Sequence, residues 1–292
     1  MTELPHDKWS RWLLERRFAS DPQRVQAVLA SLYPIRNKVL DYANLGEGEV
    51  LLDVGCGDGL ITFGALERVK TSKAIFCDIS QALLTHAQAI AQDLQVLDRC
   101  QFLCAPAEDL SALADASVDV VTTRSVLLYV TAKQQAFKEF YRVLRPQGRL
   151  SIFEPINRFV FPQPLHRLGW YDVTPVLEIA QKVKAVYQRL QPPETDPMLN
   201  FDERDLLAMA EVAGFSAIYL QLEAEITPVA KEQWEVYLHT PSNPTIPTLK
   251  EVMQEVLTPK ETEQLVSHLR LLVEAGKGEM KKAFAYLQAV KQ

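Results

Sequence analysis

The chain concentrates glycine in one short segment, where backbone groups could bind a ligand. Six of its 11 glycines lie within the 19 residues from Gly46 to Gly64. Glycine is required where the backbone takes a positive φ or where a ligand approaches it closely. An apolar run, residues 50–54, precedes most of these glycines, and an amphipathic pattern follows them. A loop between a strand and a helix presents backbone N–H groups near the helix N-terminus, so this segment predicts a nucleotide-type binding loop.

The spacing of glycines and acids in this loop indicates the kind of ligand. The loop reads Asp53-Val54-Gly55-Cys56-Gly57-Asp58-Gly59. A dinucleotide fingerprint, G-x-G-x-x-G, requires a third glycine at position 60, where this chain has leucine. The carboxylates of Asp53 and Asp58 would repel a pyrophosphate. They suit a ligand that has an amino group or other cationic character.

The residues after the loop predict the sheet that positions it. Short apolar runs alternate with amphipathic stretches over residues 49–153. This alternation predicts an α/β fold with a Rossmann-like, doubly wound, mostly parallel sheet, whose ligands bind at the carboxyl ends of the strands. A further strand is expected at 217–226. Residues 279–290 fit an antiparallel last strand, and a C-terminal helix fits them almost as well. The strands expected before these are 50–54, 74–78, 100–104, 118–122 and 149–154, and the helices are 60–69, 81–94 and 132–144.

Segments outside this alternation predict four regions. Residues 1–45 have helical spacing, with new helices expected at Pro22 and Pro34, and form an N-terminal helical cover. Residues 46–154 form the Rossmann-like core. Residues 155–200, which hold seven prolines, form a lid insertion. Residues 201–292 complete the core sheet and hold a helical insertion at 231–276.

Composition excludes several classes of function. The chain has 292 residues, 31 Lys and Arg, and 37 Asp and Glu, a net charge of −6 that argues against binding nucleic acid over a broad surface. No apolar run reaches the roughly 18 residues of a membrane span, and the first nine residues are polar, so we expect a cytoplasmic protein without a signal peptide or membrane segment. The four cysteines form no CxxC pair, so neither a metal site nor a disulfide framework is expected.

At this point the sequence resembles a known family. Residues 51–59 (LLDVGCGDG) are similar to the first motif of the class I S-adenosylmethionine-dependent methyltransferases. Asp78 ends the second expected strand, where that family has an acid that hydrogen-bonds the ribose. Together the motifs cover roughly residues 35–225, and they imply S-adenosylmethionine as cofactor. The later segments that match in order are Ala107–Leu110, Asp119–Leu127 and Val143–Leu150.

The resemblance implies a set of cofactor-binding residues. The loop backbone would lie beneath the methionine part of the cofactor, and Asp78 would bind the ribose hydroxyls. The segment at Ala107 and Glu108 would lie on the adenine side. The residues assigned to the cofactor are Asp53, Gly55, Cys56, Gly57, Gly59, Asp78, Ile79, Ala107, Glu108 and Arg124.

Two departures from the family pattern bear on function. Pro106 stands where the family often has an acid, so Glu108, Asp109 or backbone must contact the adenine amino group. After the fourth strand many relatives read Leu-His-His, whereas this chain reads Leu128-Tyr129-Val130 and lacks a histidine base there. The Asn/Asp-Pro-Pro-aromatic tetrad of amino-directed DNA methyltransferases is also absent, which again argues against nucleic acid.

Acceptor-site residues are expected at the strand ends and in the covering segments. Methyl transfer from a sulfonium depends mainly on positioning, and a base is needed when the acceptor is a hydroxyl or an acidic carbon. We predict Glu154 and Tyr129 as the orienting or catalytic groups, although Glu154 could instead cap or ion-pair the lid. The predicted acceptor-binding residues are Tyr33, Arg36, Asn157, Arg158 and Trp170. For Arg36 and Arg158 solvated surface positions are the alternative, and for Tyr33 a core position.

The covering segments are rich in aromatic residues, which predicts an apolar acceptor. The expected function is therefore methyl transfer to a small, largely apolar molecule, on oxygen, nitrogen or carbon, in natural-product or quinone-type metabolism. The alternatives are a protein or RNA methyltransferase and a non-catalytic S-adenosylmethionine-binding module. The sequence leaves the oligomeric state open. The aromatic residues concerned are Trp9, Trp12, Tyr33, Phe159, Phe161, Trp170 and Tyr171.

Overall fold

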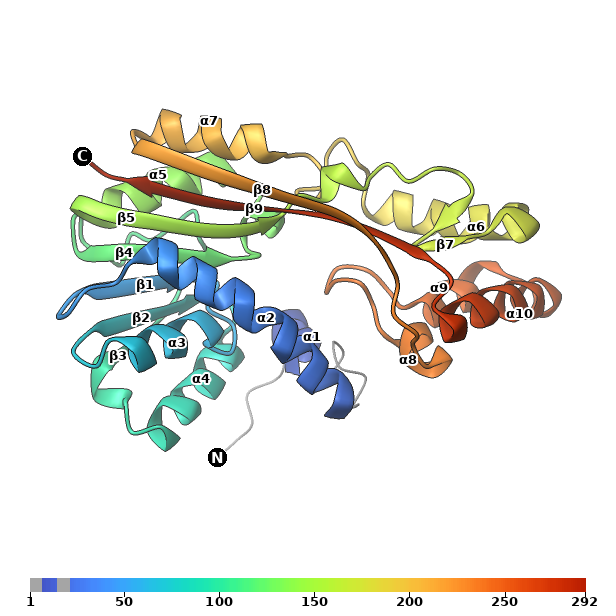
Figure 1. The fold of residues 1–292 in the computed structure, drawn as a ribbon, viewed down its shortest axis with the longest axis horizontal. Coiled ribbons are helices and arrows are strands. Elements are labelled where there is room, and N and C mark those ends of the chain that lie inside the picture. Colours follow the sequence, from blue (N-terminus) through green and yellow to red (C-terminus); the bar gives the residue numbers. More distant parts are fainter. Residues whose placement is uncertain (1–6, 15–21) are drawn as a thin grey trace.

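A seven-stranded sheet organises the larger part of the molecule (Figure 1). The computed structural model describes residues 7–14 and 22–292, with the side chains of 22–27 left out, so parts of the predicted N-terminal cover lie outside the described residues. The strand order is β3-β2-β1-β4-β5-β9-β8. Its strands are β1 (Val50–Val54), β2 (Lys73–Asp78), β3 (Cys100–Cys104), β4 (Val118–Arg124), β5 (Leu144–Pro155), β8 (Ser216–Pro228) and β9 (Glu279–Val290).

The pairing confirms the predicted fold class. The pairs β3–β2, β2–β1, β1–β4 and β4–β5 are parallel, and β9 pairs antiparallel with both β5 and β8. The last segment, 279–290, is therefore a strand and not a helix. The buried residues Ala283, Ala285 and Leu287 alternate along this segment. This spacing favours the strand, because every second residue of a strand lies on the same face.

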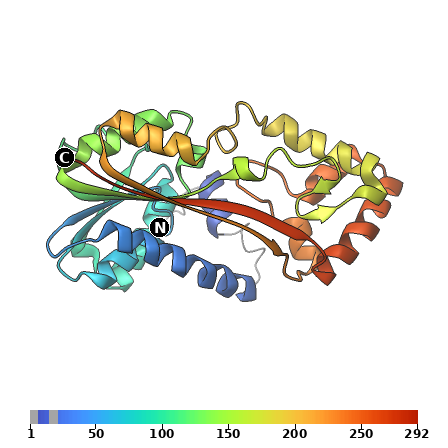
Figure 2. The ribbon, with the colours of Figure 1, turned by 45° about the horizontal axis from the view of Figure 1, so that its top comes forward.

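Helices cover both faces of this sheet. On one face lie α2 (Pro22–Ala43), α3 (Leu60–Arg68) and α4 (Gln81–Asp93), and on the other lie α5 (Lys133–Val143) and α7 (Glu203–Ala213) (Figure 2). Leu51 belongs to the apolar core beneath α2, α3 and α4, and Leu52 to the apolar core beneath α5 and α7. Successive strand residues thus bury opposite faces, as in a doubly wound sheet.

The proline at position 34 does not begin a new helix, contrary to the sequence-based prediction. It lies inside α2, which runs unbroken from Pro22 to Ala43. A proline inside a helix removes one backbone hydrogen bond, a cost that burial elsewhere along the helix can offset. Val39, Leu40 and Ala43 are buried against the sheet, and the Ser151 hydroxyl on β5 donates to the Val39 carbonyl at 2.8 Å. Tertiary packing therefore holds α2 together through the proline.

The remaining segments form a second part, which we call the helical lobe: residues 164–190 and 229–276. It contains the short strands β6 (Arg167–Leu168) and β7 (Tyr171–Asp172) and the helices α6 (Leu177–Leu190), α8 (Trp234–His239), α9 (Leu249–Val256) and α10 (Pro259–Ala275). These elements share one apolar core. Residues from the lid and from the helical insertion thus fold together.

The long antiparallel pair β8–β9 runs from the sheet to the helical lobe (Figure 1). The short helix α1 (Lys8–Leu14) lies near the carboxyl ends of the parallel strands. Within residues 7–14 and 22–292, no helix has the length and apolar character that crossing a membrane requires.

The shared core of the helical lobe gives a stability prediction with a matched pair of leucines in α10. Leu269 is 0% exposed and Leu271 is 71% exposed. We expect Leu269→Ala to lower the free energy of unfolding by about 2–5 kcal/mol, the usual cost of an apolar cavity, and Leu271→Ala to change it by less than about 0.5 kcal/mol. Chemical denaturation of the two variants measures this difference. Equal losses would mean that the lobe lacks a packed core.

Candidate functional site

The glycine loop between β1 and α3 is fixed by the end of β2. The N–H groups of Gly55 and Cys56 both donate to the Cys77 carbonyl, at 2.7 and 3.0 Å. Gly55 has a φ of 68°, and a Cβ atom built there would lie 2.2 Å from Val126 Cγ2. Only glycine fits this position, because the segment after β4 lies directly against the loop.

The same loop continues into the first turn of α3. Gly59, with a φ of 86°, is the N-cap residue, and a Cβ atom there would come within 2.5 Å of the Phe63 ring. Gly57 also has a positive φ, and its N–H donates to the Asp78 carboxylate at 2.9 Å. The loop therefore lies with its backbone close to its neighbours at the carboxyl ends of β1 and β2.

Asp78 is held in one orientation at the end of β2. Its second carboxylate oxygen accepts from the Ser80 N–H at 2.9 Å, and the side chain is 7% exposed. Burial raises the pKa of this carboxyl, while the N–H bonds lower it. Ile79 beside it is 50% exposed, so an apolar side chain is accessible next to the Asp78 carboxylate at the strand end.

The predicted adenine-side residues lie next to Asp78. The Ala105 N–H donates to the Asp78 carbonyl at 3.2 Å, which brings the segment after β3 to the end of β2. Ala107 is buried and Glu108 is half-buried. Arg124, at the end of β4, is half-buried, and its charge lowers the pKa of Asp53.

Asp53 is a correction to the predicted site. Its side chain is 1% exposed, and its two oxygens accept from the hydroxyls of Thr62 and Thr122 at 2.7 and 2.9 Å. Burial raises its pKa to about 6. The carboxylate lies behind the loop and joins β1 to α3 and β4, so it supports the loop from within.

Glu154 is a second correction. The sequence predicts an orienting or catalytic group at the crevice, but this side chain is 0% exposed. Its carboxylate accepts the N–H groups of Val126, Leu127 and Leu128 at 2.8, 2.8 and 3.2 Å. Burial raises its pKa to about 7 against these hydrogen bonds. Glu154 therefore fixes the backbone after β4, including the residue that excludes a side chain at position 55.

Tyr129 lies at the end of the segment that Glu154 fixes. It is half-buried, and its ring meets the Trp9 ring edge-on, with centroids 4.7 Å apart. Trp9 belongs to α1, whose start is tied to α4 because the Ser80 hydroxyl donates to the Asp7 carboxylate at 2.5 Å. A Cβ atom at Gly57 would lie 3.2 Å from Leu13 of the same helix. The helix α1 thus contacts the segments after β1, β2 and β4.

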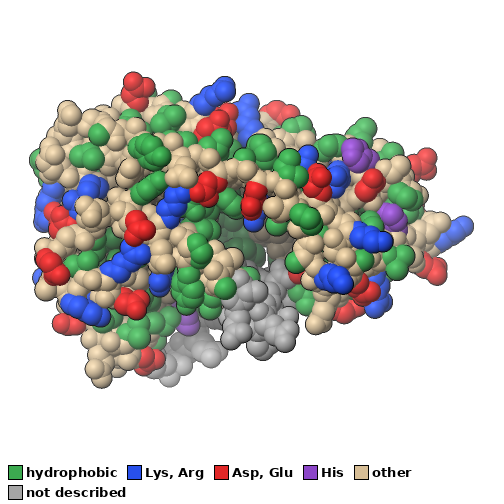
Figure 3. All heavy atoms as spheres, in the orientation of Figure 1, with side chains coloured by type: hydrophobic (Ala, Val, Ile, Leu, Met, Phe, Trp, Pro, Cys, Tyr) green, Lys and Arg blue, Asp and Glu red, His purple; other side chains and the backbone are tan. Residues whose placement is uncertain are grey.

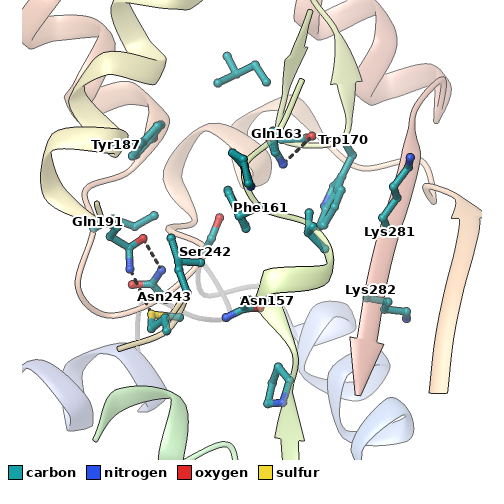
Figure 4. A pocket seen from close by; sticks show the side chains of 18 of the residues that line it. Asn157, Phe161, Gln163, Trp170, Tyr187, Gln191, Ser242, Asn243, Lys281 and Lys282 are labelled. Atoms are coloured by element: carbon teal, nitrogen blue, oxygen red, sulfur yellow. Dashed lines mark hydrogen bonds between the residues drawn. The ribbon is translucent and has the colours of Figure 1, made fainter. Parts of the chain in front are cut away.

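A cavity of about 470 Å³ opens between the end of β5 and the helical lobe. On the face shown in Figure 3, a hollow with hydrophobic side chains separates the two parts, while acidic and basic side chains are interspersed elsewhere. Asn157 and Trp170, two of the predicted acceptor residues, line the cavity together with Phe161 (Figure 4). Most other lining side chains are apolar, and Gln191 and Asn243 form a polar patch joined by a hydrogen bond of 3.3 Å.

The other predicted acceptor residues lie elsewhere. Arg36 bonds to Asn37, lies 3.9 Å from Glu67 and stands 4.7 Å from the Tyr33 ring centroid, so both Arg36 and Tyr33 belong to the surface of α2 next to α3. Arg158 is exposed and lies 3.9 Å from Asp202. Long basic side chains reach solvent readily, so their presence in a covering segment does not place them in a cavity.

Several residues at the site are missing from the sequence-based prediction. Asp7, Leu13 and Ser80 contact the cofactor-side loops, and Met198 and Leu199 line the cavity. The proline-rich turn at 241–247, which contains Asn243, can be recognised in the sequence. No neighbouring residue indicates that this turn lies near the end of β5. Among the described residues, no group of three or more His, Cys, Asp or Glu side chains could hold a metal ion.

Comparisons with known proteins find relatives of this chain. A family model described as "Methyltransferase domain" matches residues 52–152. The ubiquinone/menaquinone biosynthesis C-methyltransferase UbiE of Roseobacter denitrificans is 33% identical over 212 residues, which is 66% of this chain and 82% of that protein. The protein of the same name from Cereibacter sphaeroides is 29% identical over 189 residues, 63% and 72% of the two chains.

A solved structure shows the same fold. The YcgJ protein from Bacillus subtilis aligns with a TM-score of 0.54 and 17% identity, over 88% of this chain and 97% of that one.

The buried carboxyl of Glu154 gives a pH prediction. Its pKa is about 7 in the folded chain and near 4.5 when unfolded, so its contribution to stability is present below about pH 4.5 and is lost as the pH rises through 7. We expect the free energy of unfolding of Glu154→Gln, relative to that of the parent, to increase by roughly 3 kcal/mol from pH 4.5 to 8, because only the parent loses stability as Glu154 ionises. Denaturant unfolding across this range measures the difference. Parallel curves for the two proteins would contradict the assignment.

Proposed function

The chain belongs to the class I S-adenosylmethionine-dependent methyltransferases, and we propose that it methylates a small, largely apolar molecule held in the cavity between the sheet and the helical lobe. The observation that carries this proposal is the position of the cavity. Its lining begins at Pro155, the last residue of β5, and β5 pairs with β4, which pairs with β1. The cavity and the glycine loop therefore open at the same edge of the sheet.

The residues at the loop fit the methyl donor. Glycines at 55, 57 and 59 keep side chains away from the backbone where the methionine part would lie. Asp78 would accept the ribose hydroxyls, and Ile79 would contact one face of the adenine. Ala107 and Glu108 would border that face. Bound S-adenosylmethionine supplies a methyl group on a positively charged sulfur. When the methyl group is transferred, the sulfur is left as a neutral thioether.

The chain's own contribution to the reaction is chiefly positioning. A cavity lined mostly by apolar side chains excludes water, and its polar side chains can orient an acceptor. Asn157 has a carbonyl oxygen and an NH₂ group, so it can bind a carbonyl or a hydroxyl of the acceptor. Tyr129 stands at the end of the neighbouring strand and would meet the acceptor from the β4 side.

We propose carbon as the methylated atom and a quinone-type ring as the acceptor. The support is the name of the relatives, which are C-methyltransferases of quinone biosynthesis. The dimensions and the aromatic lining of the cavity, with Phe161 and Trp170, suit a flat ring. A hydroxyl on such a ring would make the neighbouring carbon nucleophilic, and Asn157 would orient that hydroxyl. The carbon that gains the methyl group then loses its hydrogen as a proton, which passes to water.

Cofactor binding gives the first functional prediction. Asp78→Ala removes the proposed ribose contacts, each about 1.5–3 kcal/mol if charge-assisted, and should weaken S-adenosylmethionine binding tenfold or more. Calorimetric titration measures it. Asp93→Ala, an exposed acid on α4, serves as the control and should bind normally. Because Asp78 also accepts two backbone N–H groups, the melting temperature of each variant is needed. Unchanged affinity in a folded Asp78→Ala protein would reject the assignment.

Acceptor binding gives the second functional prediction. A panel of phenols, quinols, amines, peptides and RNA, assayed by S-adenosylhomocysteine formation, should show turnover of the quinols or related rings. For the acceptor found, Asn157→Ala should raise KM about tenfold, whereas the neighbouring Arg158→Ala, whose side chain does not line the cavity, should not. Turnover of peptides or RNA alone would overturn the proposal, and cofactor binding without any turnover would favour a non-catalytic module.

A further inference from the structure

We propose that Lys133 and Glu154 together position both walls of the acceptor site: Glu154 binds the N–H side of the first wall, and Lys133 binds its carbonyl side and joins it to the second wall. One wall is the segment after β4, residues 126–130, and the other is the end of the lid, residues 197–200. The inference rests on the proposed function, because it assigns these segments to the acceptor site. Both are positioning residues and neither lines the cavity.

The carboxylate of Glu154 holds the N–H side of the first segment. Three successive N–H groups, from Val126 to Leu128, point at its two oxygens. Residue 125 has a φ of 58°, and its N–H donates to the Phe153 carbonyl at 2.8 Å, so the chain turns sharply at this point. The turn directs the following N–H groups inward, where only this carboxylate meets them among the described residues.

The ammonium group of Lys133 holds the carbonyl side of the same segment. It is 6% exposed and donates to the Val130 carbonyl at 2.9 Å. Its other bonds go to the lid: 2.8 Å to the Pro197 carbonyl and 3.4 Å to the Asn200 amide oxygen. Phe201 places its ring centroid 4.7 Å from the same nitrogen. One cation therefore joins two segments more than sixty residues apart in the chain.

The end of the lid carries side chains that line the cavity, and the segment after β4 borders the glycine loop. Met198 and Leu199, between the two lid groups bonded to Lys133, line the cavity. Tyr129 precedes Val130, and Val126 lies against Gly55 of the loop. The acids whose charges act on Lys133 are Glu154 on β5, Asp196 next to the lid contacts and Asp205 on α7. A buried lysine is destabilising unless its N–H donors are hydrogen-bonded. Lys133 can therefore stay buried only when both walls supply their oxygen acceptors.

The test compares two lysines with the same local chemistry. Lys291 also donates to backbone carbonyls, those of Tyr141, Arg142 and Leu144, but at the amino end of β5, far along the sheet from the cavity. Lys133→Met and Lys291→Met should therefore both lower the melting temperature. Only Lys133→Met should raise the acceptor KM, by about tenfold, and lower kcat, while S-adenosylmethionine affinity changes less than threefold.

Hydrogen exchange supplies a readout that does not depend on turnover. In Lys133→Met, amide exchange should accelerate at least tenfold in residues 126–130 and in residues 198–200 together, and in Lys291→Met in neither. Acceleration in only one segment, or equal kinetic changes in both variants, would overturn the inference. An inactive parent protein would instead refute the proposed function, and the exchange result would still decide whether Lys133 couples the two segments.

Discussion

Two buried carboxylates set the shape of the site, because each must be satisfied by donors that belong to neighbouring segments. Asp53 takes hydroxyls from α3 and β4, and Glu154 takes three backbone N–H groups from the turn after β4. A buried acid without such donors would be strongly destabilising. The glycine loop, the end of β4 and the end of β5 can therefore move relative to one another only by breaking these bonds.

The molecule places its two expected binding regions on one edge of the sheet. The parallel strands β1 and β2 end at the glycine loop and at Asp78, and β4 ends at Arg124, before the segment that carries Tyr129 (Figure 1). The next strand, β5, ends at the cavity. The helical lobe encloses the far side of that cavity because β8 and β9 extend past the core and carry the chain into and out of it. The helix α1 covers the other region through contacts with three strand-end segments.

The sequence predicted the parts of this structure that depend on short-range pattern. The strand–loop–helix at 50–68, the alternation that follows it and the position of Asp78 at a strand end all require only neighbouring residues. The direction of a buried side chain was not predictable in this way. Glu154 is at the expected strand end, but its oxygens point to N–H groups almost thirty residues earlier, which no local pattern specifies.

The same limit applies to the helical lobe and to the N-terminal helix α1. The lobe assembles from two segments separated by α7 and β8, and the Ser80–Asp7 bond joins residues 73 positions apart. Pro34 shows the opposite case, a strong local signal for a helix boundary that tertiary packing overrides. The unbroken helix also explains why Arg36 and Tyr33 are not acceptor-site residues, because it places them next to α3 and not at the cavity.

A crystal structure of the protein with S-adenosylhomocysteine would test the central claim, which is that the donor and the acceptor meet at this edge of the sheet. The account predicts that the ribose binds Asp78, that the homocysteine part lies on the backbone of residues 55–59, and that the sulfur faces the cavity at Asn157 with a continuous void between them. A sulfur directed away from that cavity, or separated from it by a wall of side chains, would contradict it.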